Sequence, residues 1–307
     1  MRTILVTGGA GFIGSHLVDH LVTGEDRIRV LDDLTTGNTG NLAGVAGRID
    51  LIEGSVTDRS AVEKAVRGCD VVFHLAALPS VAQSVADPLR SHEISATGTL
   101  NVLNAARLEK ARRVVYAASS SAYGDQPGDV RRETDLLLPL SPYAAAKLAG
   151  EHYCRCFHEA YGLETVCLRF FNVFGPRQDP KRPYSGVIPL FINAMRQGKR
   201  PTIFGDGLQS RDFVYVADVV QALTRAAAAP SAAGNVYNVG TGQSITILDL
   251  VTALNAILGL QMQPILAPPR AGDVRHSRSD ITLARKELGF DPTVSIEEGL
   301  RRTVDMA

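Results

Sequence analysis

Long apolar segments are missing from this 307-residue sequence, and no hydrophobic run reaches the roughly 20 residues that a membrane-spanning helix needs. The first predicted strand begins at residue 3, which leaves no room for a secretory signal peptide. The formal net charge is zero, because 32 Lys and Arg residues balance 32 Asp and Glu residues. We therefore expect a cytoplasmic protein that binds neither nucleic acid nor an anionic membrane.

Cysteine is scarce, with four residues at Cys69, Cys154, Cys156 and Cys167. Cys154 and Cys156 lie in a predicted helix with one residue between them, so their side chains point in different directions. No second Cys or His pair at zinc-ligand spacing accompanies them. The sequence therefore predicts reduced structural thiols and no metal site.

Glycine is concentrated in one turn near the start of the chain. The apolar run 3–7 leads into Gly8, Gly11 and Gly14, and a helical pattern follows over 15–22. Gly8 lets the chain leave the strand sharply, Gly11 lets the backbone approach a pyrophosphate, and Gly14 lets the helix pack closely. The free N–H groups of the helix N-terminus would face the phosphates. This pattern indicates a dinucleotide-binding turn.

An acidic side chain follows the second apolar run. Residues 28–31 lead into Asp32, 18 positions after Gly14. A carboxylate at the tip of the second strand can bind both ribose hydroxyls and repels a 2′-phosphate. We therefore expect NAD rather than NADP.

Strand-like and helix-like segments alternate through the chain, which predicts an α/β fold with a doubly wound parallel sheet covered by helices on both faces. In such folds the ligand binds beyond the carboxyl ends of the strands. A polar, turn-rich segment over 175–183 is expected to be a loop that leaves the sheet. The predicted strands cover 3–7, 28–31, 51–54, 70–77, 113–118, 164–171, 201–207 with its turn, and 235–239. The predicted helices cover 15–22, 59–66, 91–110, 143–161, 187–197 and 246–258.

Tyr143 and Lys147 share one helix face because they stand four residues apart. Ser141 is a suitable N-cap and Pro142 a suitable first-turn residue. The positive helix end and the nearby ammonium group should both lower the pKa of the phenol from its usual value of about 10. Tyr143 could then accept a proton from a hydroxyl. Taken alone, such a pair is more often a surface contact.

Three consecutive serines, Ser119, Ser120 and Ser121, follow the predicted strand 113–118. A hydroxyl at this strand end could bond a reacting oxygen and relay its proton. The other interpretation is a solvated turn or a helix N-cap.

Together these elements resemble the extended short-chain dehydrogenase/reductase family, and within it the nucleotide-sugar 4-epimerases that act on UDP-N-acetylglucosamine and UDP-glucose. The resemblance covers nearly the whole chain. Its motifs are 7–14, 74–77, 119–124, 141–143 with Lys147, 168–175, 210–213 and 272–277.

The resemblance implies a mechanism in which NAD stays bound while the sugar C4 is oxidised and then reduced from its other face. Tyr143 would take the proton of the 4-hydroxyl, Ser119 would bond the same oxygen, and Lys147 would hold the nicotinamide ribose. Ser119 is chosen among the three serines by counting back from Tyr123, and Ser121 would then face the sugar.

The sequence departs from the family pattern at two positions. Ser55 stands in place of an Asp near the adenine, and Ser95 stands in place of an Asn. The resemblance also implies two sets of binding residues. Besides Tyr143 and Lys147, the implied NAD-binding residues are Gly8, Gly11, Phe12, Ile13, Gly14, Asp32, Asp33, Thr36, Gly37, Ser55, Val56, Leu75, Ala76, Ala77 and Phe170. The implied substrate-binding residues are Ser80, Ser121, Asn172, Val187, Phe204, Arg211, Arg270, Asp273 and Ser277. Of these, Arg211 and Arg270 would bind the diphosphate, Asp273 the uridine ribose, and Val187 and Phe204 the base.

The predicted organisation has an NAD-binding Rossmann domain over 1–173, to which 213–244 returns. A smaller, interleaved substrate domain would comprise 174–212 and 245–307. The resemblance further suggests a homodimer built from the helices 91–110 and 143–161.

Four functions compete. Ser277 stands where glucose-specific relatives often carry Tyr, so a small side chain would leave room for an N-acetyl group. A UDP-glucuronate 4-epimerase would need a cation for the sugar carboxylate, and Lys181 or Arg182 are candidates. A 4,6-dehydratase needs an Asp-Glu pair where Ser120 and Ser121 stand. A non-catalytic NAD-sensing protein commonly loses the Tyr143 and Lys147 pair.

Overall fold

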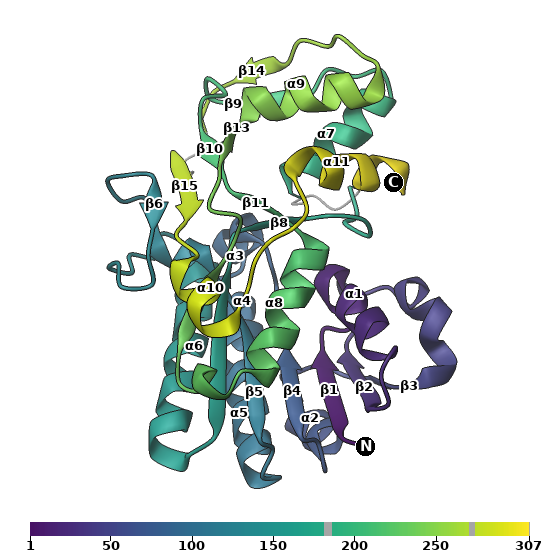
Figure 1. Ribbon diagram of the computed structural model, residues 1–307, viewed down its shortest axis with the longest axis vertical. Helices are drawn as coiled ribbons and strands as arrows, with labels where there is room; N and C mark the ends of the chain where they lie inside the picture. The colour runs from purple at the N-terminus through teal and green to yellow at the C-terminus, as the bar shows by residue number, and fades with distance from the viewer. Residues whose placement is uncertain (181–185, 270–273, 307) are drawn as a thin grey trace.

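The computed structural model describes residues 1–180, 186–269 and 274–306. Its centre is a seven-stranded sheet in the order β12-β7-β5-β4-β1-β2-β3, in which all neighbours are parallel (Figure 1). The order reverses direction at β1 and β4, as a doubly wound fold requires. The strands are β1 (Thr3–Thr7), β2 (Arg27–Asp32), β3 (Ile49–Glu53), β4 (Val71–His74), β5 (Arg113–Ser119), β7 (Glu164–Phe170) and β12 (Val236–Val239).

Helices cover both faces of this sheet, because successive apolar side chains of each buried strand point to opposite sides. In β1, Ile4 and Val6 pack in one apolar core and Leu5 packs in the other. The first core is closed by α1 (Phe12–Leu21), α8 (Val216–Ala228) and α10 (Thr282–Leu288). The second is closed by α2 (Arg59–Val66), α5 (Gly98–Leu108) and α6 (Pro142–Tyr161). The predicted fold class is confirmed.

The local signals for helix α6 act as expected. Ser141 caps the helix, since its Oγ accepts a hydrogen bond from the Ala144 N–H at 3.1 Å, and Pro142 occupies the first turn. Gly162 ends the helix in the left-handed conformation with φ of 69°. The sequence therefore places Tyr143 in the first turn of α6, next to the carboxyl end of β5.

The predicted helix over 91–110 is wrong in its bounds and regularity. The helical stretch begins with α4 (Pro88–His92), because Asp87 caps it and Pro88 takes its first position. A π-helical turn over Glu93–Thr97 then joins it to α5. The turn brings Gly98 so close to Val56 that a Cβ there would lie 2.6 Å from Val56 Cγ2. The residue periodicity of the sequence does not reveal this irregularity.

A smaller unit lies beyond the carboxyl ends of the sheet strands (Figure 1). Its apolar core joins side chains of α7 (Val187–Arg196), α9 (Ile247–Leu258) and α11 (Ile296–Asp305). Two short sheets lie between this unit and the large sheet. They are the four-stranded sheet of β13 (Ile245–Thr246), β10 (Ser210–Arg211), β15 (His276–Ser279) and β6 (Val130–Arg131), and the pair β11 (Phe213–Tyr215) and β8 (Asn172–Phe174). The pair β14 (Ile265–Ala267) and β9 (Thr202–Phe204) lies within the smaller unit, at its far end (Figure 1).

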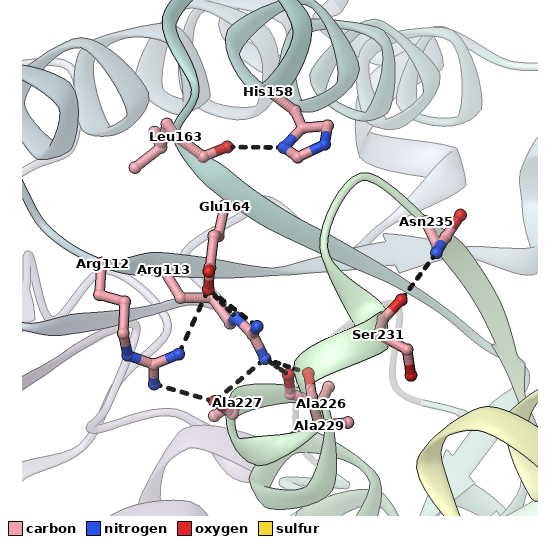
Figure 2. Close-up of polar contacts among 10 residues, drawn as sticks. All are labelled: Arg112, Arg113, His158, Leu163, Glu164, Ala226, Ala227, Ala229, Ser231 and Asn235. Atoms are coloured by element: carbon pink, nitrogen blue, oxygen red, sulfur yellow. Dashed lines mark hydrogen bonds and ion pairs between the residues drawn. The ribbon is translucent and has the colours of Figure 1, made fainter.

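A buried arginine fixes α8 to the amino ends of the sheet strands, which lie opposite the cleft end. Arg113 is 1% exposed, and its guanidinium donates to the carbonyls of Ala226 at 2.8 Å and Ala229 at 2.7 Å (Figure 2). Its charge is paired with Glu164 at 2.8 Å. These bonds satisfy carbonyls that the end of α8 leaves without helical partners. The stretch 226–229 is thus a helix end.

The cysteines form no disulfide bond in the described structure. Cys154 is buried, Cys156 is exposed, and all four thiols are free. Within the described ranges, no helix has the length and apolar character needed to span a bilayer.

Candidate functional site

A cleft of about 1160 Å³ lies between the carboxyl ends of the sheet strands and the smaller unit. Its walls come from the glycine turn after β1, the ends of β2, β4 and β5, the first turns of α6, and segments of the smaller unit. This is where a doubly wound sheet binds its ligand.

At two positions of the glycine turn, only glycine fits. Gly8 has φ of +70°, and a Cβ on it would lie 2.8 Å from the Ala76 backbone nitrogen. A Cβ on Gly14 would lie 2.1 Å from the Gly8 carbonyl oxygen. The first turn of α1 therefore packs directly on the turn, with no acidic residue to repel an anion. The site fits a dinucleotide diphosphate at the helix N-terminus.

Asp32 ends β2 and lines the cleft, although it is only 6% exposed. Its Oδ2 accepts a hydrogen bond from the Ala10 N–H, and its Oδ1 accepts one from the Leu34 N–H, each at 2.9 Å. These bonds fix the carboxylate, and each oxygen has two lone pairs that can accept bonds. Asp32 therefore fits the binding of ribose hydroxyls at this strand end.

The three predicted catalytic side chains meet in this cleft. Ser119 is the last residue of β5, and its hydroxyl lies near enough to the Tyr143 phenol to favour the ionised form of that group. Ser119 Oγ also lies 2.8 Å from Ser121 Oγ and accepts the Ser121 N–H at 3.2 Å. Lys147 Nζ donates to the Ala117 carbonyl at 2.7 Å, also on β5. One strand end thus positions the whole group.

The expected lowering of the Tyr143 pKa is wrong for the chain by itself. Burial raises the pKa of this phenol, and the Ser119 hydroxyl only partly offsets the effect. Burial also lowers the pKa of Lys147 to about 8, so its ammonium is less available as a neighbouring charge above that pH. Desolvation of the charged forms outweighs the helix terminus and the i, i+4 pairing here.

We expect Lys147→Met to stabilise the protein at neutral pH. Since one pKa unit corresponds to about 1.4 kcal/mol, the shift of Lys147 from 10.5 to about 8 costs roughly 3 kcal/mol of folding free energy. This cost is fully present below pH 8 and disappears as the pH rises through 10.5. The unfolding free energies of parent and variant, measured with urea between pH 6.5 and 10.5, should therefore converge with rising pH. A constant difference would contradict the assigned cause.

Most of the predicted binding residues line the same cleft as the predicted catalytic side chains. They are Gly8, Gly11, Phe12, Ile13, Gly14, Asp32, Asp33, Thr36, Val56, Leu75, Ala76, Ala77, Ser80, Ser121, Phe170, Asn172, Arg211 and Ser277.

Four predicted residues do not line it. Gly37 packs behind Asp32, where a Cβ would lie 2.5 Å from the carboxylate. The Ser55 hydroxyl turns to Thr57 Oγ1 at 3.0 Å. Val187 packs on the apolar core of the smaller unit, and Phe204 lies in β9, beside β14. Arg270 and Asp273, like Lys181 and Arg182, lie outside the described residues.

Sequence reasoning missed part of the cleft wall. Arg177 and Gln178 line the cleft from the loop after β8, and Asn193 lines it from α7. Arg177 has φ of +67° and pairs with Asp19 of α1 at 2.6 Å. A turn-rich loop gives no signal for this placement. Ser95, in contrast, is 1% exposed and does not line the cleft.

The sequence model of the "NAD dependent epimerase/dehydratase family" matches residues 4–240, which span the glycine turn, the predicted catalytic side chains and β12. The chain belongs to the NAD dependent epimerase/dehydratase family. This assignment confirms the predicted family resemblance, the NAD cofactor and the prediction that the protein is an enzyme.

Several named members of the family are similar over almost their full length. The UDP-glucose 4-epimerase of Mycolicibacterium smegmatis is 41% identical, with 99% of this chain and 98% of the relative covered. A solved UDP-N-acetylglucosamine 4-epimerase from Methanobrevibacter ruminantium, in complex with UDP-N-acetylmuramic acid, is 40% identical with a TM-score of 0.95; 99% of this chain and 97% of that one are covered. A dTDP-glucose 4,6-dehydratase of Streptomyces niveus is 34% identical, with 98% and 91% covered. Family membership alone thus leaves the reaction open.

Proposed function

We propose that the protein is a UDP-sugar 4-epimerase that acts through a transient 4-keto sugar. The observation that carries the proposal is that Ser119, Tyr143 and Lys147 line one cleft together with the glycine turn after β1. The similarity to UDP-glucose and UDP-N-acetylglucosamine 4-epimerases supports it.

The chain's own residues would bind the cofactor and move one proton. Gly8, Gly14 and Asp32 would hold NAD, which when bound supplies hydride transfer at the sugar carbon. Tyr143 would take the proton of the 4-hydroxyl and later return it. Ser119 would donate a hydrogen bond to the same oxygen, whose partial negative charge increases as the proton leaves.

The residues beside Ser119 argue against a 4,6-dehydratase. Dehydration needs one group that protonates the leaving hydroxyl at C6 and another that removes a proton at C5. Ser120 and Ser121 occupy these positions and line the cleft. A hydroxyl is too weak an acid and base for this task near neutral pH. We therefore favour epimerisation, although dehydratases are among the relatives.

Ser277 is our candidate for the gate beside the sugar C2. It lies in β15, paired with Arg211 of β10, and both residues line the cleft. The small side chain would leave room for an N-acetyl group. We therefore propose that the enzyme accepts UDP-N-acetylhexosamines, and UDP-hexoses as well. UDP-glucuronate is the alternative substrate, because two similar solved structures are of a UDP-glucuronic acid 4-epimerase from Bacillus cereus.

We expect Ser277→Tyr to lower kcat/KM for UDP-N-acetylglucosamine at least about tenfold while UDP-glucose turnover changes little, because the phenol ring fills the space of the acetyl group. Arg278→Tyr is the matched control, since the next residue of β15 points to the opposite side. Equal turnover of the N-acetylated sugar by the Ser277→Tyr enzyme and the parent would refute the gate.

The reaction itself is tested by offering UDP-glucose, UDP-N-acetylglucosamine and UDP-glucuronate separately and identifying the products by NMR. Inversion at C4 with unchanged mass supports epimerisation. Loss of water indicates a dehydratase. No product together with bound NAD would indicate a sensing protein and would refute the proposal.

We also propose the predicted domain division and a homodimer that uses the face of α5 and α6. Exposed apolar side chains lie on these helices, with Leu108 58% and Tyr161 56% exposed. The two helices pack side by side and could form a four-helix contact with a second copy. The molar mass from light scattering, for the parent and for Tyr161→Asp, tests this assembly.

A further inference from the structure

A chain of buried polar side chains joins helix α6 to the serine turn, defined here as residues 119–123. Arg169 of β7 is its centre. The Arg169 guanidinium donates to Glu151 from Nε at 2.9 Å and from Nη2 at 2.5 Å. Its Nη1 donates to the Tyr123 hydroxyl at 2.8 Å, and this hydroxyl donates to Asn238 Oδ1 at 2.7 Å.

These groups are almost completely removed from solvent. Arg169 is 3% exposed, Glu151 5%, Tyr123 1% and Asn238 0%. Taking an ion pair out of water costs nearly as much free energy as the pairing returns, so a buried pair adds little net stability. Its effect is geometric, because each bond fixes one element relative to another.

At one end, these linked side chains fix the rotation of α6 about its axis. Tyr143, Lys147 and Glu151 follow one another at four-residue spacing, so they share one face of the helix. Lys147 is bonded to Ala117 of β5, and Glu151 is bonded to Arg169 of β7. Two adjacent strands therefore hold the face that presents the phenol.

At the other end, the same linked side chains fix the serine turn. Tyr123 is the last residue of its 3₁₀ turn, and the Arg169 guanidinium also lies over its ring at 4.8 Å. At the start of the turn, the Ser121 N–H donates to Ser119 Oγ. That bond uses one lone pair of Ser119, and so it orients the hydroxyl that meets Tyr143.

We propose that Arg169 and Tyr123 are positioning residues that hold the Ser119 hydroxyl against the Tyr143 phenol by fixing the serine turn to α6. They act through Ser119, and the inference rests on the proposed epimerase function. When this connection is loosened, Ser119 stabilises the phenolate less well, and the pH at which Tyr143 becomes a base rises.

The test uses Tyr123→Phe, which removes one hydroxyl and leaves the ring in place. Glu151→Gln is avoided because an uncompensated buried guanidinium can unfold the chain. For Tyr123→Phe we expect kcat to fall about tenfold with KM nearly unchanged, and the low-pH limb of the kcat profile to move up by about one pH unit, the size expected for one weakened hydrogen bond to a charged group.

Tyr237→Phe is the matched control. Tyr237 is also 0% exposed and donates its hydroxyl to Glu287 at 2.7 Å, but it does not line the cleft. This variant should lose comparable thermal stability without a shift in the pH profile. Arg169→Lys keeps the charge but lacks the fork that reaches both partners, so it should reproduce the shift.

Two outcomes distinguish the two proposals. A parent enzyme that epimerises, together with a Tyr123→Phe variant that keeps the parent's kcat and pH profile, would overturn the positioning role alone. An equal shift in Tyr237→Phe would overturn it too, because general destabilisation would then be the cause. A parent that epimerises no UDP-sugar would refute the proposed function and this inference with it.

Discussion

Replacing Tyr143 with Phe should lower kcat by about 10²- to 10⁴-fold, the usual contribution of a general base. The variant loses only a hydroxyl, so α6 keeps its cap at Ser141 and the hydrogen bond from Lys147 to β5. NAD content should be unchanged in the purified protein. The effect therefore appears in kcat for the UDP-sugar, measured at saturating substrate across pH 6 to 9.

Tyr153→Phe is the control for this experiment. Tyr153 lies on the same helix but is 37% exposed and does not line the cleft. It should epimerise at the parent rate. If Tyr143→Phe inverts the sugar as fast as Tyr153→Phe, another group is the base, and the proposed role of Tyr143 is wrong.

Replacing Gly14 with Ala should abolish dinucleotide binding and lower the unfolding free energy by about 3 kcal/mol or more. The added Cβ would lie 2.1 Å from the Gly8 carbonyl oxygen and 2.8 Å from Gly9 Cα, so backbone must move rather than a side chain. The N-terminus of α1 then leaves the place where its N–H groups meet a diphosphate. Bound NAD, measured after denaturing the purified protein, should be absent.

Gly44→Ala provides the matched substitution. A Cβ on Gly44 meets nothing within 4 Å, and no positive φ strains the position. This variant should retain its NAD and its melting temperature. Retention of NAD by Gly14→Ala as well would show that the turn does not hold the cofactor in the way proposed.

Patterns local in sequence predicted the fold well. The bounds of α2 agree with the prediction, because Asp58 caps that helix through its own side chain. The strands of the large sheet were also located, because buried parallel strands appear as short apolar runs. The helix after Asp87 was located less well, since the residue pattern gives no signal for its π-helical turn.

The site was predicted only in part. Residues at strand ends, such as Asp32 and Ser119, line the cleft because topology alone brings the strand ends together. Val187 and Phe204 do not line it, because their positions depend on how the smaller unit packs. Arg177 was overlooked, since a loop carries no periodicity from which a placement could be predicted.

The sequence by itself determined the parallel sheet and the glycine turn, because each follows from residues close together in the chain. The tertiary structure alone decided the electrostatics. Burial raises the pKa of Tyr143 and lowers that of Lys147, which reverses the expectation from helix position. The tertiary structure also brings Tyr123, Glu151 and Arg169 into contact. Desolvation and long-range contacts depend on what the folded chain places around each group.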